Sequence, residues 1–149
     1  MTPVQSDVQE PSAITPGRRK IRHKPTILVL DDDIAIVRWL HTSLSSFGYE
    51  VLDATEPNRT LLLLASFVVD AVILDVQLEA SSGLDVLEFI RSEPSLAHLP
   101  VIVLTGLELT HEREETIRQG HAHLIQKSEG IDAVVTTLDG LLEYPDKTW

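Results

Sequence analysis

The sequence contains no cysteine among its 149 residues. This absence excludes a disulfide framework and any metal site built from thiolates. It also lacks an apolar run of roughly 18 residues, which a membrane-spanning helix needs, so we expect no membrane segment. The N-terminus shows no basic stretch followed by an apolar one, the pattern of a secretory signal. These absences together predict a cytoplasmic protein.

Positive charge is scarce and unevenly distributed. The chain has 12 Lys and Arg against 23 Asp and Glu, a formal net charge of −11. Five of the basic residues but only two acidic ones lie in residues 1–24, which also hold three prolines and show no periodic pattern. We expect this segment to be a disordered basic N-terminal tail. Nucleic acid phosphates would repel the acidic remainder, so direct DNA binding by the core is not expected.

From residue 25 on, short apolar runs alternate with helical segments. Apolar residues do not alternate with polar ones in the runs "TILVL" (26–30), "AVIL" (71–74) and "VIVL" (101–104). Uninterrupted apolar runs of this length are typical of strands buried on both faces. Weaker strand candidates are 50–54 and 122–126. Between the strands, apolar spacing and end signals predict helices over 34–47, 57–66, 84–91, 110–119 and 129–143.

Five successive strand–helix units predict an α/β fold, in which a parallel sheet carries helices on both faces. Right-handed crossovers and a length of about 120 residues suit a five-stranded doubly wound sheet of the flavodoxin-like order 2-1-3-4-5, with five helices. A barrel of eight such units would need roughly twice the length. We therefore expect one domain over residues 25–146.

Polar residues follow four of the five apolar runs. Asp31 and Asp32 follow the first run, Asp75 the third, Thr105 the fourth and Lys127 the fifth. Ligands of doubly wound sheets bind beyond the carboxyl ends of the strands, so we expect these side chains to converge. Three carboxylates close together need a cation, and a set of oxygen ligands without Cys or His favours Mg²⁺.

The third aspartate of "DDD" has a separate interpretation. Asp33 directly precedes a predicted helix, so its carboxylate is expected to cap the first turn. Taken singly, the other residues also have structural interpretations: an Asp pair is often a turn or cap, Thr105 is a good strand former, and most lysines are surface residues. Only their combination, in this order, indicates a site.

This combination resembles the receiver domain of two-component response regulators, of the stand-alone type, over about residues 26–143. In that family an acidic pair ends the first strand. The phosphoryl-accepting Asp ends the third and is followed eight residues later by Gly, as Asp75 and Gly83 are in "DVQLEASSG". Thr or Ser before a small residue ends the fourth strand, matching Thr105-Gly106. A Lys ends the fifth strand seven residues after a Gly, matching Gly120 and Lys127.

The resemblance implies roles for these residues. Asp75 would accept the phosphoryl group, and Mg²⁺ would be held by Asp31, Asp32, Asp75 and the backbone carbonyl of Gln77. Lys127 would pair with Asp75 at rest and with a phosphoryl oxygen afterwards, while the Thr105 hydroxyl would donate to another. The implied phosphodonor is a sensor histidine kinase or a histidine phosphotransfer protein. No enzyme activity is expected beyond the protein's own phosphorylation and dephosphorylation.

The 22 residues after Lys127 leave room for one helix. We therefore expect a stand-alone receiver that acts through protein–protein contacts with a downstream target, on the face formed by residues 110–143. The same face could form a homodimer. No membrane partner is expected.

Three positions depart from the family pattern. Glu79 stands where the family usually has Pro, Ser128 stands where a cis-Pro usually follows the Lys, and Leu124, beside His123, replaces the usual aromatic switch residue. These departures leave open a pseudo-receiver, a binding module that does not use phosphate. A small Mg²⁺-dependent phosphohydrolase with an aspartyl intermediate is a second alternative, although that class needs an acid where Gln77 stands.

Overall fold

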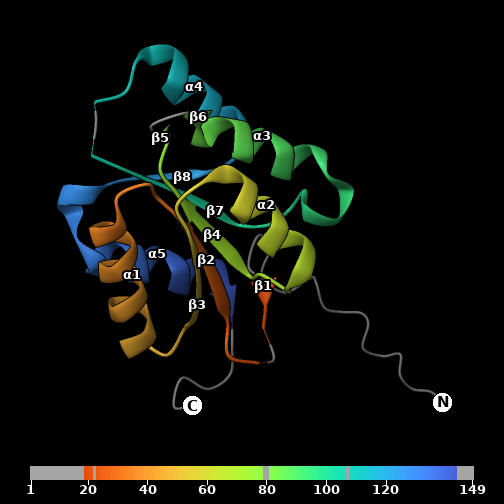
Figure 1. Ribbon diagram of the computed structural model, residues 1–149, viewed down its shortest axis with the longest axis vertical. Helices are drawn as coiled ribbons and strands as arrows, with labels where there is room; N and C mark the ends of the chain where they lie inside the picture. Colours follow the sequence, from red (N-terminus) through yellow and green to blue (C-terminus); the bar gives the residue numbers. More distant parts are fainter. Residues whose placement is uncertain (1–18, 22, 79–80, 107, 144–149) are drawn as a thin grey trace.

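The computed structural model describes residues 19–21, 23–78, 81–106 and 108–143. In these residues it places a five-stranded sheet, two small strand pairs and five α-helices (Figure 1). The strands are β1 (Arg19–Lys20), β2 (Thr26–Leu30), β3 (Glu50–Ala54), β4 (Ala71–Leu74), β5 (Gln77–Leu78), β6 (Ser81–Ser82), β7 (Val101–Thr105), β8 (His123–Gln126) and β9 (Leu142–Glu143). The helices are α1 (Ile34–Ser46), α2 (Pro57–Ser66), α3 (Gly83–Ser92), α4 (His111–Gln119) and α5 (Ile131–Leu141), with short 3₁₀ turns η2 (Pro94–Leu96) and η3 (Lys127–Glu129).

The main sheet is entirely parallel and has the spatial order β3-β2-β4-β7-β8. Counted along the chain as strands one to five, this is the order 2-1-3-4-5, so the predicted fold is confirmed. The winding direction reverses between β2 and β4, because β3 lies on one side of β2, whereas β4, β7 and β8 lie on the other. A crevice for ligands is expected beyond the carboxyl ends of these two strands.

Both faces of the sheet are buried, as the uninterrupted apolar runs predict. Figure 1 shows α1 and α5 on one face and α2, α3 and α4 on the other. Within β2, Leu28 and Leu30 pack in the cluster under α2, α3 and α4, whereas Ile27 and Val29 pack in the cluster under α1 and α5. Successive side chains of a strand point to opposite faces, so a strand covered on both sides needs apolar residues at every position.

Helix boundaries follow local capping chemistry. Asp33 is the N-cap of α1 and its Oδ1 accepts a hydrogen bond from the Ala35 N–H at 2.9 Å, which confirms the predicted cap. The last helix starts at Ile131 rather than 129, because Lys127–Glu129 forms a 3₁₀ turn and Gly130 has a φ of +85°. Among the described helices, none combines the length and the apolar character needed to cross a bilayer.

The N-terminal segment differs from the expected disordered tail at its end. Residues 19–20 pair in parallel with residues 142–143, and the Ile21 N–H donates to the Glu143 carbonyl at 2.6 Å. Ile21 is only 3% exposed and packs in the cluster under α1 and α5. A single isoleucine among basic residues has no periodic pattern, so the sequence contained no signal for this contact. Residues 1–18 lie outside the described residues, and the domain limits at 25 and 146 stay predictions.

Candidate functional site: an acidic cluster at the carboxyl end of the sheet

The carboxyl ends of β2 and β4 bring Asp31 and Asp75 together. In the parallel register Leu30 is paired with Leu74, so the next residue of each strand reaches the same edge. The Asp75 N–H also donates to the Leu30 carbonyl at 3.0 Å, which continues the pairing one residue beyond the strand. Both aspartates are buried, with exposed fractions of 2% for Asp31 and 6% for Asp75.

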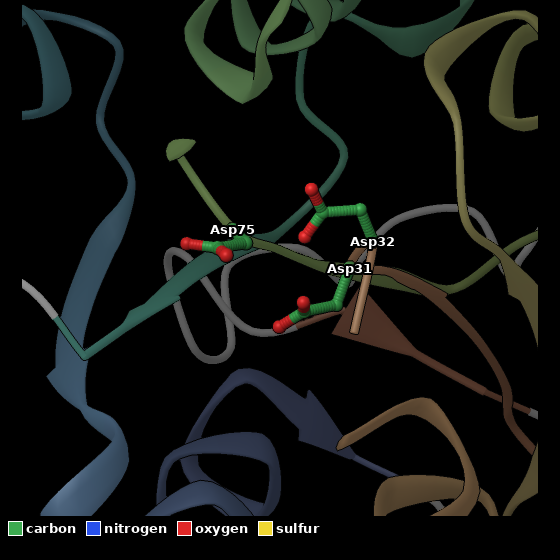
Figure 2. A group of neighbouring side chains, drawn as sticks. All are labelled: Asp31, Asp32 and Asp75. Carbon is green, nitrogen blue, oxygen red and sulfur yellow. The ribbon is translucent and has the colours of Figure 1, made fainter. Parts of the chain in front are cut away.

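Asp32 completes a cluster of three carboxylates. One carboxylate oxygen from each of Asp31, Asp32 and Asp75 lies within 4.8 Å of the other two. Figure 2 shows the three side chains gathered at the sheet edge, two from the end of β2 and one from the end of β4. Asp32 is exposed, so the cluster opens to solvent on its side. The predicted convergence of these three residues is therefore found in the structure.

The cluster has the donor chemistry that Mg²⁺ prefers. Its ligands are all carboxylate oxygens, and hard cations that retain several waters take such oxygens through one or two carboxylates. Among the described residues this is the one group of three or more His, Cys, Asp or Glu close enough to share an ion. The residues present thus fit a divalent hard cation.

Lys127 supplies a positive charge at the same place. Its Nζ lies 2.8 Å from Asp31 Oδ2 and 3.5 Å from Asp75 Oδ2. We expected the ammonium to pair with Asp75, and in the structure its nearer partner is Asp31. The ammonium therefore lies between the two buried carboxylates of neighbouring strands and offsets their mutual repulsion.

The environment of Lys127 acts on its pKa in two opposite directions. Burial lowers the pKa, because a low dielectric disfavours the charged amine. The hydrogen bond to Asp31 and the negative charges of Asp31 and Asp75 outweigh this effect, and the net result is a raised pKa. Lys127 is consequently a permanent cation at neutral pH.

Thr105 and Gly106 lie at the same edge of the sheet. Thr105 is fully buried at the end of β7 and is paired in register with Gln126, the residue before Lys127. A Cβ placed on Gly106 would lie 3.5 Å from Cδ of Lys127, so the aliphatic part of the lysine passes over this glycine. The predicted hydroxyl and amine therefore come from adjacent strand ends.

Gly83 packs directly against the residue that we expect to accept phosphate. A Cβ at this position would lie 1.8 Å from the Asp75 carbonyl oxygen, and the Gly83 N–H donates to the Val76 carbonyl at 3.2 Å. The absence of a side chain thus lets the first residue of α3 approach the end of β4. This contact gives a physical reason for a glycine eight residues after the aspartate.

The structure gives less information about the remaining predicted positions, Gln77, Glu79 and Leu124. Gln77 lies in β5, two residues beyond Asp75, and pairs with Ser82; its role as a carbonyl ligand stays a prediction. Glu79 lies outside the described residues. Leu124, at the position expected for an aromatic switch residue, is 38% exposed on β8, and its neighbour His123 is also exposed.

Sequence reasoning missed two side chains, Glu129 beside the site and Arg91 at the opposite, amino ends of the strands. Glu129 accepts a hydrogen bond from the Gln126 N–H at 2.8 Å, and the spacing of a Gln and a Glu three residues apart could have indicated this capping box. Arg91, half-buried on α3, donates to the carbonyls of Gly120 and Leu99, each at 2.7 Å. Burial lowers the pKa of this guanidinium, and nothing in the sequence pattern distinguished it from a surface arginine.

Comparison with known protein families agrees with this geometry. A family model described as the response regulator receiver domain matches residues 27–139. The response regulator MprA of Mycolicibacterium vanbaalenii is 35% identical over 116 residues, which are 78% of this chain and 49% of the relative. The response regulator PleD of Caulobacter vibrioides is 31% identical over 101 residues, 68% of this chain and 22% of the relative. The chain thus spans half or less of the length of these relatives.

Solved structures show the same fold. The chemotaxis protein CheY4 of Vibrio cholerae has a TM-score of 0.74 and 23% identity, over 80% of this chain and 100% of that chain, a likeness that concerns the fold alone. The response regulator protein TrrA of Thermotoga maritima, solved in complex with Mg²⁺-BeF, has a TM-score of 0.69 and 29% identity, over 79% and 99% of the two chains. The family match favours a receiver over a phosphohydrolase.

Proposed function

Because this chain belongs to the response regulator receiver domain family, we propose that it accepts a phosphoryl group on Asp75 and passes on a signal through protein contacts. The observation that carries the proposal is the gathering of Asp31, Asp32 and Asp75 within 4.8 Å, with the Lys127 ammonium between two of them. Phosphoryl transfer depends mainly on positioning and charge neutralisation, and this site supplies both.

Asp75 is the acceptor in this proposal because of its place in the sheet. It follows β4, which lies between β2 and β7 in the sheet, so side chains from both neighbouring strand ends can reach a group attached to it. Both Asp31 oxygens have close partners: Oδ1 accepts from the Asp33 N–H at 2.9 Å, and Oδ2 lies 2.8 Å from Lys127 Nζ. The same ammonium lies 3.5 Å from Asp75 Oδ2, so it can also contact a group attached to Asp75.

The proposed step transfers the phosphoryl group from the imidazole of a phosphohistidine. A carboxylate oxygen of Asp75 attacks phosphorus, a P–O bond forms, and the P–N bond breaks as the imidazole leaves with its electron pair and takes up a proton. Lys127 then pairs with one phosphoryl oxygen, for which a compact point charge is suited, and the Thr105 hydroxyl donates to another.

Asp31, Asp32, Asp75 and the Gln77 carbonyl are the proposed ligands of Mg²⁺. When bound, this cation would neutralise negative charge on the acceptor and on the phosphoryl oxygens. The chain's own contribution is to hold two carboxylates buried at adjacent strand ends and to keep a permanent ammonium beside them. Beyond its own phosphorylation and dephosphorylation, we propose no turnover of another substrate.

The proposed partners are a sensor histidine kinase or a histidine phosphotransfer protein upstream and a protein target downstream. We place the output on the surface of residues 110–143, which includes α4, β8 and α5, and a second copy of this chain could bind there. An added phosphoryl group would draw Thr105 and its loop inward, and the loop leads directly to α4. We propose that this signalling takes place in the cytoplasm, without DNA contacts by the acidic core.

Incubation with a small acyl phosphate and Mg²⁺, followed by intact-mass measurement, tests the proposal. The wild type should gain the mass of one phosphoryl group, and the Asp75→Asn variant should not. Equal gain by the variant would place the acceptor elsewhere. No gain by the wild type would favour the pseudo-receiver, in which the same fold binds partners without phosphate.

A further inference from the structure

The turn that carries Lys127 is built from its own hydrogen bonds. Lys127 begins η3 directly after β8, and no cis peptide bond occurs in the described part of the chain, so the Lys127–Ser128 bond is trans. The Gln126 N–H donates to Glu129 Oε2 at 2.8 Å, and the Gln126 side chain accepts from the Glu129 N–H in return. Such a reciprocal capping box holds a short turn closed at its first residue.

The C-terminal end of the turn is also fixed, by a backbone hydrogen bond and by the conformation of Gly130. The Gly130 N–H donates to the Lys127 carbonyl at 3.3 Å. Gly130 has φ +85° and ψ 178°, a region that is almost restricted to glycine. The Lys127 backbone is thus enclosed between a capping box on one side and a constrained glycine on the other.

The backbone position decides where the ammonium lies. Lysine has four flexible carbons and no fixed geometry of its own, so the place of Nζ depends on where Cα starts and on the surface that the stem follows. Here the stem passes over Gly106 and Nζ reaches Asp31 Oδ2 at 2.8 Å. A turn that opened would move the start of this stem away from the acidic cluster.

We propose that Glu129 is a positioning residue for phosphoryl transfer: by closing the capping box with Gln126, it holds the backbone of Lys127 where the ammonium lies between Asp31 and Asp75. Glu129 is exposed, and its carboxylate acts on the turn rather than on the phosphoryl group. This inference rests on the proposed function and adds a residue that the Asp, Thr and Lys pattern does not contain.

The alternative is that Glu129 acts only through its negative charge, two residues from Lys127. A glutamine separates the two roles, because a capping box accepts either Glu or Gln at this position. Glu129→Gln removes the charge and keeps the acceptor, whereas Glu129→Ala removes both. Glu88→Ala, an exposed acid on α3, is the matched control for the loss of one carboxylate.

The first measurement does not depend on phosphorylation. Each variant is treated with an amine-acylating reagent, and modification of Lys127 is read by peptide mass mapping relative to Lys24, which is distant in the fold. We expect Lys127 to react several-fold faster in Glu129→Ala, because its ammonium leaves the two carboxylates. Glu129→Gln and Glu88→Ala should react like the wild type.

The second measurement is the rate of phosphorylation at increasing Mg²⁺ concentration. Glu129→Ala should lower the maximal rate about five- to tenfold, because it removes one capping hydrogen bond that positions the Lys127 ammonium. The half-saturating Mg²⁺ concentration should stay unchanged within about twofold. Glu129→Gln should restore the wild-type rate. If Glu129→Ala does not fold, Glu129→Asp, which shortens the side chain and keeps the charge, replaces it and should show the same defects.

The two measurements keep the inference separate from the proposed function. Wild-type reactivity of Lys127 in Glu129→Ala would overturn the positioning role, and so would a defect of equal size in Glu129→Gln. If no variant, including the wild type, becomes phosphorylated, the proposed function fails, and the acylation pattern still decides whether Glu129 holds Lys127 in place.

Discussion

Gly83 and Asp75 approach each other so closely that no side chain fits between them: a Cβ on Gly83 would lie 1.8 Å from the Asp75 carbonyl oxygen. The contact joins the first residue of α3 to the residue after β4. It couples the stability of the helix start to the position of the proposed acceptor.

Gly83→Ala should therefore disturb the site through the backbone. Because the added methyl group meets a carbonyl rather than a flexible side chain, we expect a loss of about 2 kcal/mol in the free energy of unfolding, measured with urea. Mg²⁺ affinity, measured by calorimetry, should fall as well. Gly140→Ala is the control: nothing lies within 4 Å of a Cβ there, and alanine should stabilise α5 by up to about 1 kcal/mol. An unchanged Mg²⁺ affinity in Gly83→Ala would contradict this coupling.

The three consecutive aspartates should separate into distinct roles. Asp33→Ala removes the N-cap of α1 and should cost about 1 kcal/mol of stability while leaving Mg²⁺ affinity unchanged. Asp32→Asn should do the reverse, lowering Mg²⁺ affinity about tenfold or more and changing the metal-free stability little, since its side chain is exposed. Thermal unfolding with and without Mg²⁺ measures both effects. A large loss of Mg²⁺ affinity in Asp33→Ala would show that the assignments are wrong.

The raised pKa of Lys127 predicts how stability depends on pH. A raised folded-state pKa contributes stability that is fully present below the unfolded lysine pKa of about 10.4 and is lost as pH rises through the folded value. The wild type should thus be more stable than Lys127→Met from pH 7 to about 9, in metal-free buffer, and the difference should shrink above about pH 10.4. Urea unfolding across this range measures it. If the difference in stability between the wild type and Lys127→Met grew with rising pH, the raised pKa of Lys127 would be contradicted.

Ile21 tests whether the end of the basic segment belongs to the folded domain. It is 3% exposed and packs with residues of α1 and α5, so Ile21→Ala should cost about 2–4 kcal/mol in the free energy of unfolding. Val68→Ala, at a position that is 71% exposed, should change stability by less than about 0.5 kcal/mol. Equal stability of the two variants would mean that residues up to 24 do behave as a tail.

Much of the fold could be predicted because its signals are local and repeated. Uninterrupted apolar runs such as 71–74 indicate strands buried on both faces, and five strand–helix units leave few topologies. Asp75 and Lys127 could be placed at one edge because parallel strands have their carboxyl ends together. The preference of Lys127 for Asp31 could not be predicted, since it depends on the path of one flexible side chain.

Other features depend on contacts that have no sequence period. The burial of Ile21 requires β9 to lie beside it, and β9 begins only at Leu142, near the other end of the chain. The capping box of Gln126 and Glu129 begins with Gln rather than the usual Ser or Thr, so its sequence signal is weak. Neither contact repeats along the chain, so neither leaves a periodic pattern in the sequence.

The central claim, that Asp75 and not its two acidic neighbours receives the phosphoryl group, is tested most directly by locating the modification. Phosphorylated protein is reduced with borohydride, which converts an aspartyl phosphate to homoserine, and the peptides are sequenced by mass spectrometry. The account predicts homoserine at position 75 alone, and only when both phosphodonor and Mg²⁺ were present. Homoserine at position 31 or 32, or at none of the three, would contradict it.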